Sequence, residues 1–363
     1  MRPRTDVVIL GGGPAGCATA IALAREGLST LVVERTRFDA PGPGETLMGD
    51  VEPVLARLGV TDRCDRSTGF EPSRMKSAWG SSTLGDPGSH GIDAAWGWRI
   101  DRRQFDTLLI EAAERAGALV YGGLRAHVVA RDGAGWRVTL GDATSTRTEV
   151  FARYIVDATG RSAWVARRLG AKSRRIDRQV ALVAAWSRPL SDSSLVVESA
   201  PDGWWYSASF SDSHAIAVYL TDADLLGRDR LAFFRDSLAH SAHTRERLRS
   251  LGEPHLTCIA ADTSYRESCA GEGWLAVGDA AFAIDPLSGS GIRHALESGL
   301  DAGTALSRAA SGEHQALSHY EEQARLDFFR QLRWRAYYHG LESRWPSSPY
   351  WQRRSEMTPS LPN

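Results

Sequence analysis

Uninterrupted apolar runs alternate with a helical pattern at the start of the chain. Residues 7–10 and 30–33 are short apolar runs, and between them lie the glycine-rich segment 11–16 and an alanine-rich stretch, 17–26, that Gly27 ends. Runs without polar alternation are typical of strands buried on both faces. The pattern therefore predicts a strand, a tight turn, a helix and a second strand in parallel with the first.

The predicted secondary structure changes twice along the remainder of the chain. The spacing of apolar residues over 102–116 predicts an amphipathic helix, and strands are predicted over 126–131, 136–140, 153–157 and 274–277. Residues 180–220 predict three or four strands without an intervening helix, as in an antiparallel sheet. From Ile292 the pattern is mostly helical, and the proline-containing tail after Trp345 is expected to be irregular.

Composition excludes several classes of protein. The 363 residues suffice for about two domains, and 43 basic against 44 acidic residues leave a net charge of −1. This balance argues against nucleic acid or an anionic membrane as a partner. Residues 7–24 are uncharged, but their glycines and Pro14 would break a spanning helix, so a cytoplasmic protein is expected. The four cysteines are far apart, and no metal site is predicted.

A dinucleotide-binding fingerprint lies in the first turn. Gly11, Gly13 and Gly16 follow the pattern G-x-G-x-x-G between a strand and a helix. The glycines permit the turn and the approach of a pyrophosphate, which the helix N-terminus would bind. An acid at the end of the second strand accepts ribose hydroxyls in such sites. The predicted cofactor contacts in this half are Gly11, Gly13, Ala15, Gly16, Glu34 and Arg35.

The second half of the chain resembles a known flavin segment. Residues 274–299, with Gly278-Asp279 and the run from Asp285 to Ile292, are similar to FAD-dependent monooxygenases, halogenases and geranylgeranyl reductases. The segments 100–106 and 157–162 resemble two further motifs of these families. The resemblance implies non-covalent FAD, with a helix N-terminus aimed at the flavin. The cofactor residues that it implies are Arg102, Asp157, Gly160, Gly278, Asp279, Pro286, Gly289, Ser290, Gly291 and Ile292.

These observations predict an α/β fold with a discontinuous Rossmann-like FAD-binding domain, an inserted antiparallel-sheet substrate domain and a helical C-terminus. We expect the FAD-binding domain to comprise residues 1–75, 100–178 and 262–310. The substrate domain would comprise 76–99 and 179–261, and the C-terminal helical segment and tail 311–363.

A closer resemblance extends over most of the chain. It is to the flavoproteins that mature cysteine tryptophylquinone enzymes, and the motifs that carry it are Gly44–Leu47, Ser77–Ser81, Pro201–Ser207, Tyr337-Tyr338 and Arg344–Pro346. The resemblance implies hydroxylation of an electron-rich aromatic, a tryptophan or indole that is free, peptidyl or protein-bound, through a flavin C4a-hydroperoxide. O2 would be the co-substrate, and the electron donor would be NAD(P)H or a partner flavin reductase. An aromatic-lined cavity would exclude water and position the ring.

Other activities remain open at this point. Tryptophan halogenases carry a catalytic glutamate where this chain has Ser288, but Lys76 could match the lysine that they need near the substrate. A reductase of the geranylgeranyl type and a non-catalytic flavoprotein are further alternatives. The predicted catalytic residues are Ser288 and Lys76. The predicted substrate contacts are Trp79, Trp204, Trp205, Tyr206 and His294.

Overall fold

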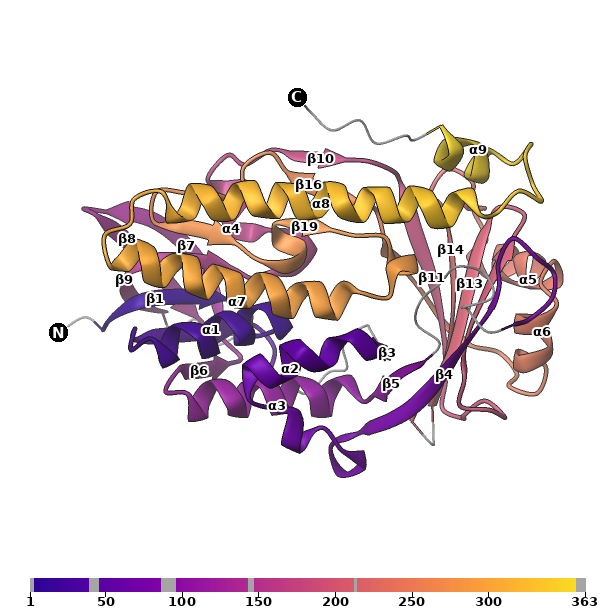
Figure 1. Ribbon diagram of the computed structural model, residues 1–363, viewed down its shortest axis with the longest axis horizontal. Helices are drawn as coiled ribbons and strands as arrows, with labels where there is room; N and C mark the ends of the chain where they lie inside the picture. The colour runs from indigo at the N-terminus through magenta and orange to yellow at the C-terminus, as the bar shows by residue number, and fades with distance from the viewer. Residues whose placement is uncertain (1–2, 39–45, 86–95, 143–146, 212–213, 357–363) are drawn as a thin grey trace.

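A computed structural model describes residues 3–38, 46–85, 96–142, 147–211 and 214–356. Gly44 and Glu45 of the resemblance motif lie outside these ranges. The described chain forms two large sheets and a helical layer (Figure 1). A small third sheet comprises β10 (Ser173–Arg175), β16 (Ser264–Arg266) and β19 (Phe282–Ala283).

The first sheet has a parallel centre. β1 (Arg4–Leu10) pairs in parallel with β2 (Thr30–Glu34) and with β9 (Arg147–Asp157), and β18 (Trp274–Ala276) extends the parallel set beyond β9. Its central residues are buried on both faces, which explains their unbroken apolar runs. In spatial order the strands are β17 (Ala270–Gly271), β18 (Trp274–Ala276), β9 (Arg147–Asp157), β1 (Arg4–Leu10), β2 (Thr30–Glu34) and β6 (Leu119–Gly122). Two further strands lie outside this order: β8 (Gly135–Gly141) pairs with β9, and β7 (Arg125–Asp132) pairs with β8.

The second sheet is antiparallel except where β12 pairs with β4. Its spatial order is β15 (His255–Ala260), β11 (Gln179–Trp186), β14 (His214–Asp222), β13 (Gly203–Ser211), β12 (Leu195–Ala200), β4 (Phe70–Ala78), β5 (Trp96–Ile100) and β3 (Thr46–Met48). The expected antiparallel strands of residues 180–220 are confirmed. β3 and most of β4 fall within the stretch expected for the cofactor domain, and the division into domains stays a prediction.

Two helices from opposite ends of the chain pack in parallel. Gly299 and Gly303 of α7 (Gly291–Ala310) lie against α1 (Pro14–Arg25), and a Cβ on Gly299 would stand 2.4 Å from the carbonyl oxygen of Ala15. Gly303 faces Ala22 further along, so both helices begin at the same end of the pair. α8 (Ala316–Gly340) then returns along α7 (Figure 1). The cofactor fingerprint and the flavin-like segment therefore place two helix N-termini side by side.

Shorter elements complete the chain. The remaining helices are α2 (Glu52–Leu58), α3 (Arg102–Arg115), α4 (Trp164–Arg168), α5 (Arg230–Ala239), α6 (His243–Leu248) and α9 (Pro349–Ser355). The single turns of 3-10 helix are η1 (Gly49–Val51), η2 (Thr61–Arg63), η3 (Arg66–Thr68), η5 (Gly160–Ser162), η6 (Gly278–Ala280) and η7 (Pro286–Ser288). None of the helices in the described ranges is long and apolar enough to cross a membrane.

The expectation of an irregular tail after Trp345 is wrong for residues 349–355, which form α9. Pro349 stands in the first turn, where its missing N–H and fixed φ suit a helix start. Tyr350 and Trp351 are buried in an apolar cluster that includes Trp79. Tertiary packing therefore orders a helix that is too short to be stable by itself.

Candidate flavin and substrate site

The fingerprint glycines shape the turn between β1 and α1. Gly11 has φ +113°, and a Cβ there would stand 2.1 Å from the carbonyl oxygen of Ala158. A Cβ on Gly16 would stand 2.0 Å from the carbonyl oxygen of Gly11. Only glycine fits at these two positions because side chains would collide with backbone. Ala15 is buried and packs against α7, so its contribution is close packing of the two helices.

Gly13 differs from these glycines because the space beside it is open. A Cβ at Gly13 would meet no atom within 4 Å, and its φ of −75° is accessible to any residue. Gly13 is also the N-cap of α1, and no side chain caps the helix. Uncapped N–H groups at a helix N-terminus bind phosphate. The open cradle therefore fits the pyrophosphate of FAD.

Glu34 adjoins this cradle at the end of β2. Its Oε2 accepts a hydrogen bond from the amide of Gly12 at 2.9 Å, and its Oε1 accepts one from the amide of Thr36 at 2.9 Å. The carboxylate thus fixes the loop and remains half-buried, where it could also accept ribose hydroxyls. Arg35 follows it and is exposed.

Substitution of Gly13 separates cofactor binding from folding. We expect Gly13→Val to fold normally but to lose FAD affinity by at least about tenfold, because the side chain enters only the phosphate cradle. Gly16→Val should instead lower the free energy of unfolding, since its Cβ collides with the chain. Thermal unfolding of the apoprotein and FAD titration followed by fluorescence measure the two effects. Unchanged FAD affinity in Gly13→Val would place the phosphates elsewhere.

The second half of the cofactor site surrounds η6 and η7. Asp279 lies 3.6 Å from the guanidinium of Arg161, in η5 beside Gly160. A Cβ at Gly160 or Gly291 would meet nothing within 4 Å. These open positions and the uncapped start of α7 fit a flavin ring that approaches the backbone. Gly278, Pro286, Ser290 and Ile292 lie in or beside the same two turns.

Gly289 makes the turn before α7 possible. Its φ is +61°, and a Cβ there would stand 3.2 Å from the Cγ and Sδ of Met48 in β3. A larger residue would be strained by the backbone conformation and would crowd Met48. The turn, β3 and the start of α7 therefore meet at one point.

Two predicted cofactor residues are engaged with the protein itself. The carboxylate of Asp157 is fully buried and accepts hydrogen bonds from the amides of Thr159, Val165 and Ala166 at 3.1, 2.8 and 2.8 Å. The carboxylate thus bonds the backbone of the protein itself, and the contact of Asp157 with a cofactor stays a prediction. Arg102 is half-buried, and its guanidinium forms a two-nitrogen contact with Asp106 at 3.0–3.3 Å. Its contact with a cofactor stays a prediction.

A cavity of about 940 Å³ opens beside the start of α7. Its walls come from the second sheet, from the turn at η7, and from facing sides of α7 and α8. Residues of these walls that figure below are Met75, Trp79, Val197, Ser288, His294, Trp334 and Tyr338. The cavity therefore adjoins the flavin-like turn and has aromatic rings at that end.

The structure brings only part of the predicted aromatic wall to this cavity. Trp79 lines it, and its Nε1 donates a hydrogen bond to the carbonyl of Tyr338 at 2.7 Å. Trp204 is buried behind Trp79, with the ring centroids 6.0 Å apart, and Tyr206 lies beside Trp204 at 6.3 Å. These two residues support the wall rather than form its surface.

Trp205 belongs to a different core. Its ring packs on Tyr219 and Phe234, with centroids 4.6 and 5.1 Å away, and it is fully buried. Successive strand residues point to opposite faces, so Trp205 faces α5 while Trp204 faces the cavity side. The structure thus does not bring Trp205 to the cavity.

Lys76 also points away from the cavity. It lies between Met75 and Ser77 on β4, and Met75 lines the cavity. Lys76 is in register with Val196 of β12 and shares a face with Glu198, whose carboxylate accepts hydrogen bonds from the amides of Ala242 and Thr244 at the start of α6. Because of the pleat of the strand, the structure does not bring this predicted catalytic residue to the cavity.

Ser288 and His294 do line the cavity. The hydroxyl of Ser288 donates to the carbonyl of Asp285 at 3.0 Å and accepts from the hydroxyl of Ser290 at 2.9 Å, so it holds the turn in shape. His294 is 8% exposed and stacks on Phe282 with centroids 4.0 Å apart, and its buried Nε2 has no hydrogen-bond partner. Burial lowers the pKa of His294 to about 4. A neutral imidazole therefore faces the site at neutral pH.

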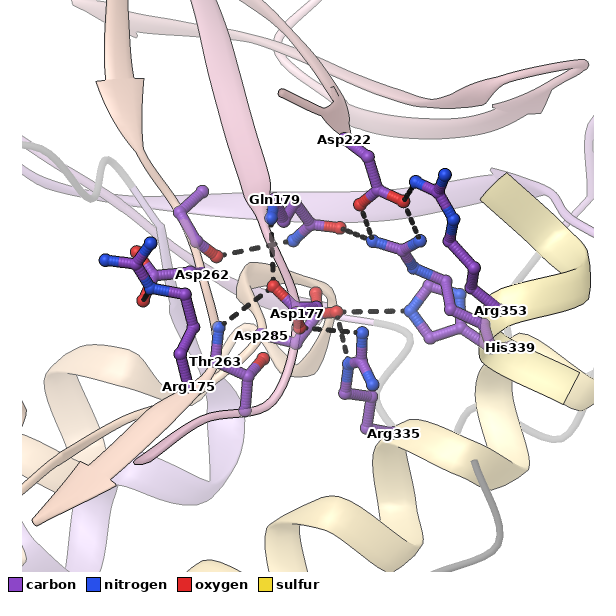
Figure 2. Close-up of polar contacts among 12 residues, drawn as sticks. Arg175, Asp177, Gln179, Asp222, Asp262, Thr263, Asp285, Arg335, His339 and Arg353 are labelled. Atoms are coloured by element: carbon purple, nitrogen blue, oxygen red, sulfur yellow. Dashed lines mark hydrogen bonds and ion pairs between the residues drawn. The ribbon is translucent and has the colours of Figure 1, made fainter. Parts of the chain in front are cut away.

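Sequence reasoning missed a buried polar network that holds the flavin-like turn. Asp285, directly before η7, accepts hydrogen bonds from Arg335 at 2.9 Å and from His339 at 3.1 Å (Figure 2). The same arginine bonds Asp177 at 2.9 Å. Burial opposes ionisation of Asp285, but the His339 hydrogen bond and the charge of Arg335 outweigh it and hold the pKa of Asp285 well below its ordinary value.

The network continues from the turn into the C-terminal helix. The amide of Gln179 donates to Asp177, and its side-chain oxygen accepts from Arg354 of α9 at 2.9 Å. Arg354 also bonds Asp222 at the end of β14 at 2.9 Å. Figure 2 shows the chain of contacts between Asp285 and Asp222. Arg335 and His339 are four residues apart on a predicted helix, so they lie on the same face of it. This spacing was the one signal in the sequence that could have indicated that the two side chains share a partner.

Comparisons with known proteins identify the family of the chain. Residues 4–334 match the family described as FAD binding domain. The chain is 29% identical to a protein of Marinomonas mediterranea described as an FAD-dependent oxidoreductase, LodB, over 96% of each chain. It is 26% identical to a 1H-pyrrole-2-carbonyl-[peptidyl-carrier protein] chlorinase of Pseudomonas fluorescens, over 85% of this chain and 75% of that one.

Among solved structures, the peptidyl tryptophan dihydroxylase QhpG superposes with a TM-score of 0.82. The two are 28% identical, and the match covers 97% of this chain and 78% of QhpG. The expected α/β fold and the FAD-binding assignment are thereby confirmed. The chain belongs to the FAD binding domain family, within the superfamily of flavin-dependent monooxygenases and halogenases.

Proposed function

We propose that this protein is an FAD-dependent monooxygenase that hydroxylates the indole ring of tryptophan. The resemblance to a peptidyl tryptophan dihydroxylase supports the substrate ring, and the cavity beside the flavin-like turn supports a site that can hold it. Bound and reduced FAD would supply the activation of O2 that oxygen insertion requires. NAD(P)H or a partner flavin reductase would supply the electrons.

The observation that carries hydroxylation over halogenation is the placement of the lysines. Halogenases need a lysine that faces the substrate, and this chain has only Lys76 and Lys172. Lys76 is on the far face of β4, and Lys172 is exposed. Ser288, at the place of the halogenase glutamate, carries no charge. Halogenation remains the second candidate because the relatives include halogenases.

The chain's own residues suit the hydroxylation of an arene. Tyr338 is partly exposed and offers ring surface on which an indole can stack in offset or edge-on geometry, and the buried Trp79 supports this wall from behind. Met75 and Val197 make the adjoining wall apolar, which limits water at the reacting carbon. The neutral His294, which is 8% exposed, adds a further ring to the wall of the cavity. Oxygen insertion into an electron-rich ring depends more on how the ring is positioned than on an acid or base supplied by a side chain.

A bromide challenge tests this proposal. With FAD, a reductant, O2 and a tryptophan-containing substrate, we expect products heavier by oxygen and none that contain bromine. Lys76→Ala should retain oxygenation within about twofold, because a required positioned group would cost hundredfold or more. Mass spectrometry of the products gives both answers. A brominated product that disappears in Lys76→Ala would establish halogenation instead.

A further inference from the structure

A second, much smaller cavity lies between the flavin-like turn and α8. Its volume of about 10 Å³ is room for one water molecule and for no larger ligand. Ser288 of the turn and Gln331 of α8 line both this cavity and the large one, so the two spaces are neighbours. Thr263, Asp285 and Arg335 complete its polar lining. We call it the Thr263 cavity.

Thr263 has a buried hydroxyl group that the protein itself does not satisfy. The residue is 1% exposed and stands directly before β16. Its amide donates to Asp177 at 3.2 Å, and its carbonyl accepts from the amide of Ile176 at 2.8 Å. The Oγ1 atom, in contrast, has no hydrogen-bond partner among the described residues. Because a buried polar group without a partner costs stability, we expect a partner that is not part of the chain.

Two further side chains of the lining can bond the same ligand. Asp285 carries an ionised carboxylate, whose oxygens can each accept more than one hydrogen bond. Gln331 is half-buried, and its amide can both donate and accept. Together with the hydroxyl of Thr263, these groups give about three polar partners, which is the usual number for a buried water molecule.

The chemistry of the lining excludes other small occupants. Cavities that stay dry are lined by apolar groups, whereas this one contains a carboxylate. The carboxylate of Asp285 already has Arg335 as its cation, with the two atoms 2.9 Å apart. Within the described part of the chain, no group of three or more His, Cys, Asp or Glu side chains could hold a metal ion. A neutral molecule that both donates and accepts hydrogen bonds therefore fits best.

We propose that one water molecule is bound in the Thr263 cavity and bridges the hydroxyl of Thr263 to the carboxylate of Asp285 and the amide of Gln331. The water joins three elements that are far apart in the chain, namely the residue before β16, the turn at η7 and helix α8. It supports the flavin-like turn alongside the direct contacts of Asp285 with Arg335 and His339 (Figure 2). This role is independent of the reaction that the protein catalyses.

The sign of one stability change tests this site. Valine has nearly the shape of threonine and lacks only the hydroxyl. If that hydroxyl were simply unpaired, Thr263→Val would remove a buried polar group without a partner and would raise the melting temperature. A bound water reverses the sign, because valine takes away one of its partners. We expect Thr263→Val to lower the melting temperature of the FAD-loaded protein by about 2 °C.

Two variants calibrate this measurement. Thr221 is fully buried and its hydroxyl donates to the carbonyl of Asp202 at 2.7 Å, so Thr221→Val should lower the melting temperature as the loss of a bonded hydroxyl does. Ser77 is also fully buried, but its hydroxyl has no partner among the described residues, and Ser77 lines neither cavity. Ser77→Ala should therefore leave the melting temperature unchanged or raise it.

A high-resolution crystal structure of the FAD-loaded protein locates the water directly. We expect one ordered water within about 3 Å of the Oγ1 of Thr263, and its loss in Thr263→Val. An empty Thr263 cavity in the parent protein would overturn the proposal. A melting temperature that rises in Thr263→Val, or that changes no more than in Ser77→Ala, would overturn it as well.

Discussion

Arg335→Met is expected to lower the free energy of unfolding by about 3–5 kcal/mol, the usual cost of breaking a buried ion pair. Arg335 is buried and bonds both Asp177 and Asp285. Its removal leaves two buried carboxylates without their shared cation. Methionine keeps most of the volume of the side chain, so the loss reports the charge and its hydrogen bonds rather than a cavity.

Urea unfolding followed by tryptophan fluorescence measures this change. Arg353→Met is the matched control, because the Arg353 side chain is 45% exposed and pairs with Asp222 and Asp224. An exposed pair contributes about 0–1 kcal/mol, so the control should unfold nearly as the parent does. A loss below about 1 kcal/mol in Arg335→Met would show that the network does not hold the turn before α7.

The second large effect is a dependence of stability on pH that originates at His294. Burial lowers its folded-state pKa to about 4, below its ordinary value of 6.5. The folded protein therefore binds the proton less readily than the unfolded chain does. The contribution of neutral His294 is complete above pH 6.5 and is lost as the pH falls towards 4, by up to about 3 kcal/mol.

His294→Gln removes this titration and keeps a polar group at the position. The free energy of unfolding of the variant should fall less steeply than that of the parent between pH 6.5 and 4. His240→Gln, at an exposed histidine, should retain the slope of the parent. Parallel pH profiles for the parent and His294→Gln would mean that His294 is not held neutral by its surroundings.

The cofactor half of the site was predictable because its constraints are local. The spacing of Gly11, Gly13 and Gly16 after an apolar strand specifies the turn, and the turn specifies where the helix begins. The run from Asp285 to Ile292 gave the second cradle in the same way. Such motifs depend on backbone conformation and close approach, which the glycines encode directly.

The substrate half of the site depends on contacts between residues that are far apart in the chain, and the sequence does not show which of them meet. Trp204 and Trp205 are neighbours in the chain but face two different cores, and strand alternation alone could not say which face meets the cavity. Trp334 and Tyr338 reach the cavity because α8 folds back along α7. The same long-range packing pairs Arg335 with Asp285, fifty positions apart. Asp157 is a predicted cofactor residue, and the hydrogen bonds that its carboxylate accepts from backbone amides of α4 could not be foreseen from the sequence.

Single-turnover oxygenation with ¹⁸O2 tests the central claim most directly. The FAD-loaded protein is reduced without oxygen, mixed with a tryptophan-containing peptide and exposed to ¹⁸O2 in the presence of bromide. Hydroxylation predicts a product in which the tryptophan residue has gained ¹⁸O from the gas. A brominated tryptophan, or full reoxidation of FAD with hydrogen peroxide as the only product, would contradict it.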